Sequence, residues 1–467
     1  MIRAASRLVT AAVVIGALVG LPITEAQAQP SRDWPTYLYS GTRTGYNGGE
    51  KIITSSTARK LTRLWVHTTG RPISTQPILV NGVVHYGSWD GYERAVDAAS
   101  GARRWAAFLG VTTDRRCAPS KSIGVVSTAT VGTIKVHGIT TRAVFVGGGD
   151  GNFYALNAST GRKIWKTRLG RPPGYFLWSS PLLYRGSIYE GVASFADCPL
   201  VRGGMVRMNA ETGAVESKFY TVPPRCTGAD VWGSPTVDAA TGDIYFATGN
   251  AGPCKKRETL GVAVIRTNAS LKLLGSWQVP SAKLPNHDSD FGSTPTLFSA
   301  SIGGVVHPMV GIQNKNGIYY AFKRYDISRG PLWQDRVASS GNCPECGKGG
   351  ISPSAYNGHL LFIGSEKIRI GHVICAGSIR AVQPSTGKVV WADCLRSGPV
   401  LGAVTAVPGL AFVDAGNTVY AVGTKRGTIV WSYKDTHSGS GFWGAPTVSG
   451  GRVYAGNQDG HLYAFGI

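Results

Sequence analysis

The sequence predicts an all-β protein: an eight-bladed β-propeller of four-stranded antiparallel blades, closed by a strand from near the N-terminus. Three observations support this fold class: a repeated strand pattern, an aromatic residue that recurs once per repeat, and the composition. The chain has 63 Gly and 25 Pro among 467 residues, and only 16% of its residues are charged. Long solvated helices need more charge, so this composition favours short strands joined by turns.

One pattern recurs along the chain: an Asp-Gly turn, an alternating strand, a Thr/Ser-Gly turn, and a strand that ends in Trp. It is seen in SWDGYERAVDAASGARRW (88–105) and GGDGNFYALNASTGRKIW (148–165). Partial copies occur at 377–391, 417–431 and 459–467. The alternation has a period of two, the dipeptide turns are hairpin signals, and a further pair of strands precedes each copy. Each unit is therefore a four-stranded antiparallel meander.

The number of blades follows from the aromatic residue near the end of the outer strand, which occurs once in each repeat. It recurs at eight positions: Trp65, Trp105, Trp165, Phe219, Trp277, Trp333, Trp391 and Trp431. The last repeat has three strands and no fourth, whereas KLTRLWVHT (60–68) is an outer strand with no blade before it. Pairing these two segments leaves no free sheet edge, so we expect the N-terminal strand to complete blade eight. An open or seven-bladed array is the alternative.

The N-terminus has the features of a secretory signal peptide. Two arginines flank the start of an apolar stretch at 8–21, and Ala-Gln-Ala (26–28) offers a small-residue cleavage site. The stretch is shorter than the ~20 residues that a membrane-spanning helix needs. We therefore expect residues 1–28 to be removed on export, residues 29–56 to form an N-terminal extension, and residues 57–467 to form the propeller.

The chain is strongly basic, with a formal net charge of +22. Such a charge favours anionic partners such as acidic polymers, envelope phosphates or a carboxylated cofactor, although general solubility explains it equally simply. The basic residues are scattered and do not interleave with aromatic residues, so nucleic acid is not an expected partner. No later stretch is long and apolar enough to span a membrane. We expect a monomer that is secreted or periplasmic.

Eight cysteines in an exported chain predict disulfides rather than metal ligands. They are Cys117, Cys198, Cys226, Cys254, Cys343, Cys346, Cys375 and Cys394. The expected pairs are Cys198–Cys226, Cys375–Cys394, Cys343–Cys346 and Cys117–Cys254, all on one face of the ring. The Cys-Pro-Glu-Cys segment lacks the following histidine that covalent haem attachment needs, because glycine stands there. We therefore expect no haem.

Five candidate site residues map to one face of the predicted propeller. In a meander of strands A to D, the B–C loop and the crossing from D to the next A share that face. The candidates there are Asp197 in blade three, Trp232 and Asn250 in blade four, and Asp290 and Lys315 in blade five. Such convergence of acid, amide, cation and aromatic groups is typical of a small-molecule site.

Each candidate also has a structural explanation. Trp178 and Trp443 stand at the repeat position of Trp232, so a structural tryptophan is an alternative there. Asparagine and Asn-Lys-Asn-Gly are ordinary turn formers. Asp288 competes with Asp290 for any catalytic role. Five coincidences together are less expected than any one alone.

The repeats resemble the pyrroloquinoline-quinone (PQQ) type, and DWPTYLYSGTRTGYN (33–47) resembles the start of the polyvinyl-alcohol-dehydrogenase-like branch. DVWGSPTVDAATGDIYFATGN (230–250) is similar to the quinoprotein dehydrogenase stretch with the tryptophan under the quinone and a metal-binding asparagine. PNHDSDFGSTP (285–295) resembles the stretch with the catalytic aspartate. NKNG (314–317) resembles the motif whose basic residue contacts the quinone oxygens, and ADCPLVRG (196–203) falls where the family has an acidic metal ligand.

On this resemblance Trp232 is the stacking platform, Asp290 the catalytic base, and Lys315 both a catalytic residue and a cofactor contact. Asp197, Asn250 and Asp290 are the implied calcium ligands, which suits a cation that prefers carboxylate and amide oxygens. The resemblance implies PQQ- and calcium-dependent oxidation of a small-molecule or polymeric alcohol, with a separate electron acceptor. The alternative is a cofactor-free secreted propeller that binds a protein or glycan of the cell envelope, because relatives also include scaffolds of outer-membrane assembly.

Overall fold

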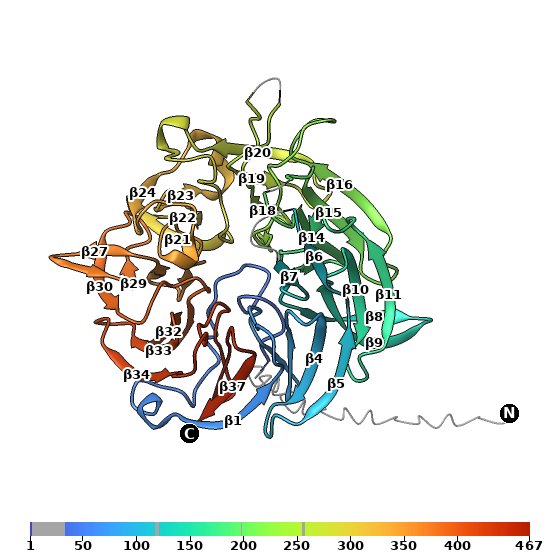
Figure 1. The fold of residues 1–467 in the computed structure, drawn as a ribbon, viewed down its shortest axis with the longest axis horizontal. Helices are drawn as coiled ribbons and strands as arrows, with labels where there is room; N and C mark the ends of the chain where they lie inside the picture. Colours follow the sequence, from blue (N-terminus) through green and yellow to red (C-terminus); the bar gives the residue numbers. More distant parts are fainter. Residues whose placement is uncertain (2–32, 117–120, 198, 255–256) are drawn as a thin grey trace. The chain divides into compact units, whose positions relative to one another are not determined.

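Eight antiparallel sheets follow one another around a common axis in chain order (Figure 1). The computed structural model describes Met1 and residues 33–116, 121–197, 199–254 and 257–467. The predicted eight-bladed β-propeller is confirmed. The predicted signal peptide lies outside the described residues.

Each of the first four blades has four strands that run outwards from the axis in chain order. Blade one is β2 (Ile78–Val80), β3 (Val83–Gly87), β4 (Tyr92–Asp97) and β5 (Arg103–Phe108). Blade two is β8 (Thr130–Val136), β9 (Ile139–Gly147), β10 (Asn152–Asn157) and β11 (Lys163–Arg168). Blade three is β13 (Leu182–Tyr184), β14 (Ser187–Ser194), β15 (Gly204–Asn209) and β16 (Val215–Tyr220), and blade four is β17 (Thr236–Val237), β18 (Ile244–Ala247), β19 (Ala263–Thr267) and β20 (Leu273–Gln278).

The last four blades follow the same plan. Blade five is β21 (Thr296–Ile302), β22 (Val305–Gln313), β23 (Ile318–Lys323) and β24 (Trp333–Arg336). Blade six is β25 (Ala355–Tyr356), β26 (Leu361–Ser365), β29 (Gly377–Val382) and β30 (Val389–Leu395). Blade seven is β31 (Thr405–Val407), β32 (Leu410–Ala415), β33 (Thr418–Gly423) and β34 (Ile429–Lys434), and blade eight is β35 (Thr447–Ser449), β36 (Arg452–Gly456), β37 (His461–Gly466) and β1 (Thr62–Thr68).

The remaining elements are short. Strand β12 (Tyr175–Phe176) pairs with β14, and two hairpins extend from loops: β6 (Thr112–Asp114) with β7 (Lys121–Ile123), and β27 (Ile368–Ile370) with β28 (Val373–Cys375). The helical turns are η1 (Ala58–Lys60), η2 (Ser281–Lys283), η3 (Arg324–Arg329) and η4 (Pro344–Cys346). In the described part of the chain, no helix is long and apolar enough to cross a membrane.

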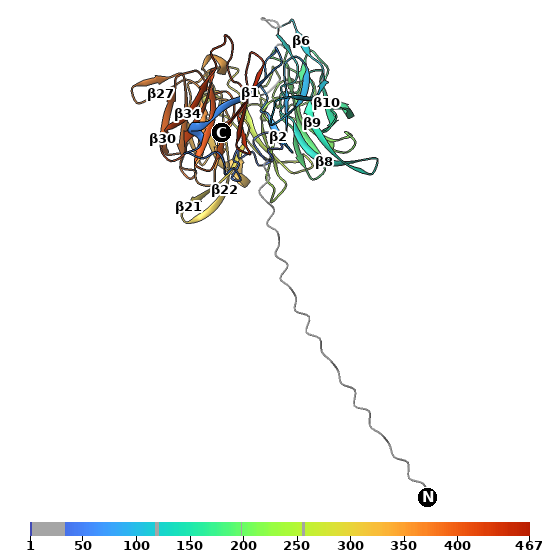
Figure 2. The same cartoon turned by 90° about the horizontal axis from the view of Figure 1, so that it is seen from below.

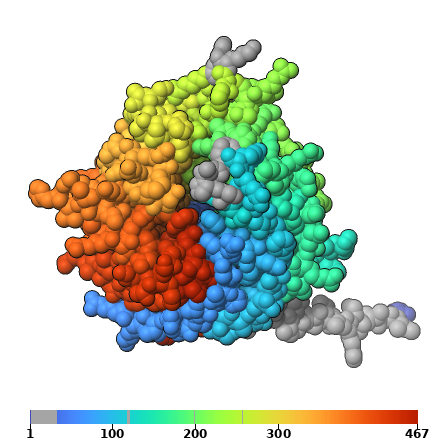
Figure 3. All heavy atoms as spheres, in the orientation of Figure 1, coloured from blue at the N-terminus to red at the C-terminus, as the bar shows by residue number. Residues whose placement is uncertain are grey.

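The N-terminal strand closes the ring, as expected. Strand β1 pairs with β37 along the outer edge of blade eight, and Trp65 faces Ala464 in that register. Blue β1 and red β37 accordingly lie side by side in Figure 1, and blue and red surfaces meet in Figure 3. Closure leaves no blade without its outer strand.

An outer-strand tryptophan joins most blades to the next. Trp105 Nε1 donates to the Ala158 carbonyl oxygen at 2.9 Å. Glycine is required at position 161 for two reasons. A Cβ there would lie only 2.7 Å from the Trp105 ring, and the backbone φ of +70° is one that residues with a side chain rarely adopt. The same bond to the following blade is made by Trp65, Trp165, Trp333, Trp391 and Trp431. The Thr/Ser-Gly turn and the tryptophan of the repeat are therefore two halves of one contact between blades.

The segment 33–47 lines the inner edges of the blades. The innermost strand of a blade has an edge that no other strand of that blade covers. Backbone N–H groups on these edges donate to carbonyl oxygens of the segment: Leu79 to Trp34, Val131 to Pro35, Val237 to Gly41, Leu297 to Thr42, Tyr356 to Thr44 and Ala406 to Gly45. Arg43 is fully buried and donates to the Pro181 and Pro235 carbonyl oxygens. The segment thus satisfies buried backbone groups of six blades.

Two kinds of connection point to opposite faces of the ring. The β6 strand belongs to a D–A crossing, and the β21–β22 hairpin is an A–B connection; in Figure 2 they project from opposite sides. The D–A face carries the predicted site residues.

Three disulfides join the described cysteines. Cys343–Cys346 and Cys375–Cys394 are as predicted. Cys226 pairs with Cys254, so the predicted partners of both residues were wrong. Cys117 and Cys198 lie outside the described residues.

The path of the crossing before blade four explains this correction. The Ala229 N–H donates to the Asn250 carbonyl oxygen, and the Gly252 N–H donates to the Thr227 carbonyl oxygen. The crossing is therefore held beside the B–C loop of its own blade. This brings the Cα atoms of Cys226 and Cys254 to 5.5 Å.

Candidate functional site

Four of the five predicted site residues line one cavity of about 260 Å³ on the D–A face. Trp232 precedes β17 and Asp290 precedes β21, each at the inner start of its blade, and Lys315 lies in the β22–β23 turn. Asp197 lines the same cavity from the loop after β14 and is the most exposed of the four. The cavity is also lined by Trp178, Asp230 and Asp288.

Lys315 is the central cation of this cavity. Its Nζ lies 2.7 Å from Asp288 Oδ1 and 2.8 Å from Asp290 Oδ1. The same Nζ lies 4.9 Å from the centroid of the Trp232 ring, a cation–π distance. Trp232 Nε1 donates to Asp290 Oδ2 at 3.2 Å. An ammonium, a carboxylate and an indole are thus held in mutual contact.

The backbone holds the turn of Lys315 against the segment that precedes β21. The Lys315 N–H donates to the Asp290 carbonyl oxygen at 3.0 Å. The turn itself is closed by Asn314, whose N–H bonds the Ile318 carbonyl oxygen and whose side chain accepts from the Asn316 N–H. The turn chemistry of Asn-Lys-Asn-Gly therefore positions Lys315 and is no argument against a role for it.

Asn250 is placed beside the cavity rather than in its wall. It follows β18 and is 8% exposed. Its Nδ2 lies 3.4 Å from Asp197 Oδ2, a long hydrogen bond that joins blades three and four. The amide oxygen and the Asp197 carboxylate are the kind of oxygen ligands that a hard cation takes.

Asp230 is a site residue that the sequence interpretation missed. It is 5% exposed, lines the cavity, and accepts the Ser194 N–H through Oδ2 at 2.6 Å. It stands five residues before Pro235, and Asp290 stands five residues before Pro295. The two aspartates therefore occupy equivalent repeat positions. This shared spacing before proline could have identified Asp230 from the sequence.

The carboxyl groups of the cavity raise one another's pKa. Burial, together with nearby Asp290, raises the pKa of Asp230 to about 7 and that of Asp288 to about 6. Burial and Asp290 also raise the pKa of Asp197. Lys315 has a raised pKa despite its burial, because Asp290 and Asp288 stabilise its charged form. Lys315 forms ion pairs with two of the four carboxyl groups, Asp288 and Asp290, so a further cation could compensate the remaining negative charge when these groups are ionised.

These residues fit a hard metal ion and a planar cofactor. The donors are carboxylate and amide oxygens, which calcium prefers, and the pKa values of Asp230 and Asp288 are raised by burial and then by the neighbouring carboxylates. Trp232 is half-buried in the wall of the cavity, and Trp178 lines the same cavity from the neighbouring blade three. A flat apolar surface of this kind suits stacking.

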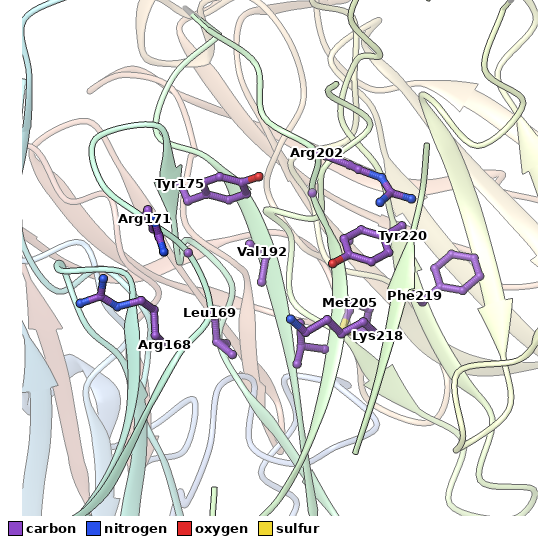
Figure 4. Close-up of a pocket in the computed structure, with 14 residues that line it drawn as sticks. Arg168, Leu169, Arg171, Tyr175, Val192, Arg202, Met205, Lys218, Phe219 and Tyr220 are labelled. Carbon is purple, nitrogen blue, oxygen red and sulfur yellow. The ribbon is translucent and has the colours of Figure 1, made fainter. Parts of the chain in front are cut away.

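A second cavity, of about 310 Å³, lies between blades two and three (Figure 4). Its charged lining is basic, with Arg168, Arg171, Arg202 and Lys218, and it contains no acidic residue. Arg202 stacks on the Tyr220 ring at 3.8 Å. This chemistry is opposite to that of the carboxylate cavity, so the two are separate sites.

Comparisons with known proteins place the chain among PQQ-type repeat proteins. The profile of the PQQ_2 family, described as outer membrane protein assembly factor BamB, matches residues 89–252 and 323–467. A polyvinylalcohol dehydrogenase from a Pseudomonas species is 24% identical over 363 residues, covering 64% of this chain and 55% of the relative. The chain spans about half the length of the first relatives it matches.

Solved structures show the same fold. The quinohemoprotein alcohol dehydrogenase from Comamonas testosteroni aligns with a TM-score of 0.73 at 18% identity, over 94% of this chain and 81% of that one. A europium-containing methanol dehydrogenase also aligns with a TM-score of 0.73 at 18% identity, over 94% and 98%.

Proposed function

This chain belongs to the PQQ_2 family of β-propeller repeat proteins, and from that premise we propose that it oxidises alcohol groups with PQQ and a calcium ion. The observation that carries the proposal is the contact of Lys315 with Asp290, Asp288 and Trp232 inside a cavity rich in carboxyl groups. Relatives named polyvinylalcohol dehydrogenase and quinohemoprotein alcohol dehydrogenase support it.

The metal would be held by oxygen atoms from three blades. Asp197, Asn250 and Asp290 are the ligands expected from the family motifs, and Asp230 adds a further carboxylate close to Asp290. When bound, calcium would supply Lewis-acid chemistry and PQQ would supply a two-electron acceptor for the oxidation of the alcohol. The cavity holds four carboxyl groups, and PQQ is itself a tricarboxylate. We therefore expect the metal to bind before the cofactor, because Lys315 is already paired with Asp288 and Asp290 and the metal adds the positive charge that reduces the repulsion between the carboxyl groups and PQQ.

The protein's own groups would orient the alcohol and take its proton. Asp290 is the proposed general base: it is 3% exposed and is fixed by Trp232 Nε1 and Lys315 Nζ. Lys315 would stabilise negative charge that develops on the cofactor oxygens. Asp288 also forms an ion pair with Lys315. An experiment must therefore distinguish Asp290 from Asp288 as the general base.

The test is calorimetric titration of the purified protein with PQQ in millimolar calcium, followed by dye reduction with a small alcohol and with polyvinyl alcohol. A parallel titration with europium(III) follows from the solved relative that contains this ion. Metal-dependent PQQ binding with alcohol-dependent dye reduction is the expected result. Absence of PQQ binding with either metal would overturn the proposal.

The alternative function is a cofactor-free propeller that binds a protein or glycan of the cell envelope, and we retain it because the family description names an outer membrane protein assembly factor. Such a scaffold does not need Trp232, Asp290 and Lys315 in the wall of one cavity with Asn250 beside it. Absence of PQQ binding, together with retention on envelope material, would favour that function.

A further inference from the structure

The basic cavity between blades two and three shares no lining residue with the carboxylate cavity. Blade two contributes the end of β11 and the loop that follows it, and blade three contributes residues of β12, β14, β15 and β16 (Figure 4). Its volume of about 310 Å³ is at the lower end of the range of about 300–1,000 Å³ for small-molecule sites. None of its residues is used in the function proposed above.

A glycine in β15 keeps this cavity open. In the register of blade three, Gly204 lies between Val192 on β14 and Tyr220, the last residue of β16. The residue that pairs with the end of the outer strand in blade two is Asn152, which has a side chain. A Cβ on Gly204 would lie only 2.1 Å from the Phe219 carbonyl oxygen, so the backbone there admits no side chain. The hollow is therefore a fixed feature of blade three.

The walls of the cavity are apolar and aromatic. Leu169, Val192 and Val206 line it and belong to the hydrophobic cluster between the two blades. In Figure 4, Tyr175 and Tyr220 extend their rings toward the space between them. Within the described residues, neither of these two hydroxyl groups forms a hydrogen bond. Aliphatic and aromatic walls of this kind suit a ligand with a flat or apolar body.

Lys218 and Arg202 add positive charge to these walls. In Figure 4 the Lys218 ammonium group points toward Leu169. The Arg202 guanidinium stacks on the Tyr220 ring, and its Nε donates to the Val222 carbonyl oxygen at 2.9 Å. In the part of the chain that the structure describes, Arg202 Nη1 and Nη2 and Lys218 Nζ form no hydrogen bond or ion pair. These groups therefore remain able to donate to an anion.

The residues that line the cavity include no acid that would compensate this charge. Glu190 stands in the same row of the sheet as Val206 and Lys218, but it is fully buried and does not line the cavity. Burial raises the pKa of Glu190 well above its usual range, which favours the neutral acid. By contrast, Arg207, the residue after Val206, is paired with Glu216. Uncompensated cations beside an apolar hollow favour an anionic ligand.

We propose that this cavity binds one organic anion that has a flat or apolar body and a carboxylate or phosphate group. The two tyrosine rings hold the body, and Arg202 and Lys218 bind the anionic group. Arg171 adds positive charge from blade two, whereas Arg168 extends away from the space between the two tyrosines in Figure 4 and makes no direct contact. The inference does not rest on alcohol oxidation, because it uses no residue of the carboxylate cavity.

The test is calorimetric titration of the purified protein, without PQQ, with three probes that share one ring system: 1-naphthyl phosphate, 1-naphthoate and neutral 1-naphthol. One equivalent of at least one anion should bind at least about tenfold more tightly than 1-naphthol, and the tighter anion identifies the anionic group. Lys218→Gln should weaken binding of that anion at least about tenfold and leave binding of 1-naphthol unchanged. The control is Lys166→Gln, which removes an exposed lysine at the equivalent position of β11 and should have no effect.

A second measurement uses only the wild-type protein and so does not depend on the variants folding. The tighter anion should slow acetylation of Lys218 by acetic anhydride, followed by mass spectrometry, and should leave Lys166 unprotected. Equal affinity for 1-naphthol and both anions, or equal acetylation of Lys218 with and without the anion, overturns the proposal. Neither readout requires PQQ or enzyme activity, so a failure of the proposed function leaves both unchanged.

Discussion

Asp230 and Asp290 occupy equivalent positions in neighbouring blades, and both carboxylates lie against Gly249. A Cβ at Gly249 would stand 2.5 Å from Asp230 Oδ1 and 3.1 Å from Asp290 Oδ2. The absence of a side chain at this position therefore allows two buried carboxyl groups to approach each other. Such an arrangement of like charges is costly unless a cation joins them.

The first prediction is that Gly249→Ala weakens calcium binding by at least about tenfold, because the new methyl group displaces the two carboxylates. Calorimetric titration with calcium measures this. Gly423→Ala is the matched control, since a Cβ there meets only the Thr428 carbonyl oxygen, at 3.6 Å. Equal calcium affinity in both variants would show that Asp230 and Asp290 do not share the ion.

The second prediction concerns the stacking surface. Trp232→Ala should weaken PQQ binding by at least about tenfold, because it removes the aromatic face of the cavity. Gly292→Ala should weaken it too, since a Cβ there would lie 2.0 Å from Trp232 Cη2 and would move the ring. Trp443→Ala removes a tryptophan at the same repeat position in blade eight and should have no effect. Fluorescence titration with PQQ in calcium compares the three variants with the wild type.

The third prediction separates the base from its neighbour. Asp290→Asn should abolish alcohol-dependent dye reduction while PQQ remains bound, because the amide cannot accept the substrate proton. Asp288→Asn should retain part of the turnover, since its carboxylate only shares Lys315. The reverse order of effects would assign the base to Asp288.

The fourth prediction is a pH dependence. The pKa of Asp230 is raised to about 7 by burial, so the folded protein keeps a proton that the unfolded chain releases near pH 4. Protons are therefore taken up on folding, and the stability of the metal-free protein should fall as the pH rises from about 4 to about 7. Calcium displaces that proton, so its stabilising effect should be larger at pH 8 than at pH 5.

Thermal unfolding with and without calcium at the two pH values measures this effect. Asp230→Asn should flatten the pH dependence of the metal-free protein. A calcium-induced shift in Tm that is equal at both pH values would contradict the coupling between Asp230 and the ion.

The fifth prediction concerns closure of the ring. Removal of residues 1–70 should unfold or oligomerise the protein, because it deletes β1 and the segment 33–47. The outer edge of β37 and the inner edges of six blades would then be unpaired, which invites pairing between molecules. Removal of residues 1–28 alone is the control. Light scattering after size exclusion and thermal unfolding compare the two, and a monomer with unchanged Tm would refute the role of the N-terminal strand.

Much of the fold could be predicted from the sequence. The Asp-Gly and Thr/Ser-Gly turns specified the hairpins, and the recurring aromatic residue gave eight blades with Phe219 in the place of one tryptophan. The unpaired strand at 60–68 predicted closure on blade eight. The site was predicted in part: the face and four residues of the cavity followed from topology and motif resemblance, whereas Asp230 was overlooked.

The sequence by itself determined the ring of eight blades. The patterns that specify the blades are local: strand alternation, turn dipeptides and one aromatic residue per repeat each depend on a few neighbouring positions. Only the tertiary structure decided that Asp230 lies beside Asp290 and that Cys226 pairs with Cys254. These contacts join loops whose separation in space depends on the path of each crossing over the blades. Spacing along the chain carries no information about that path.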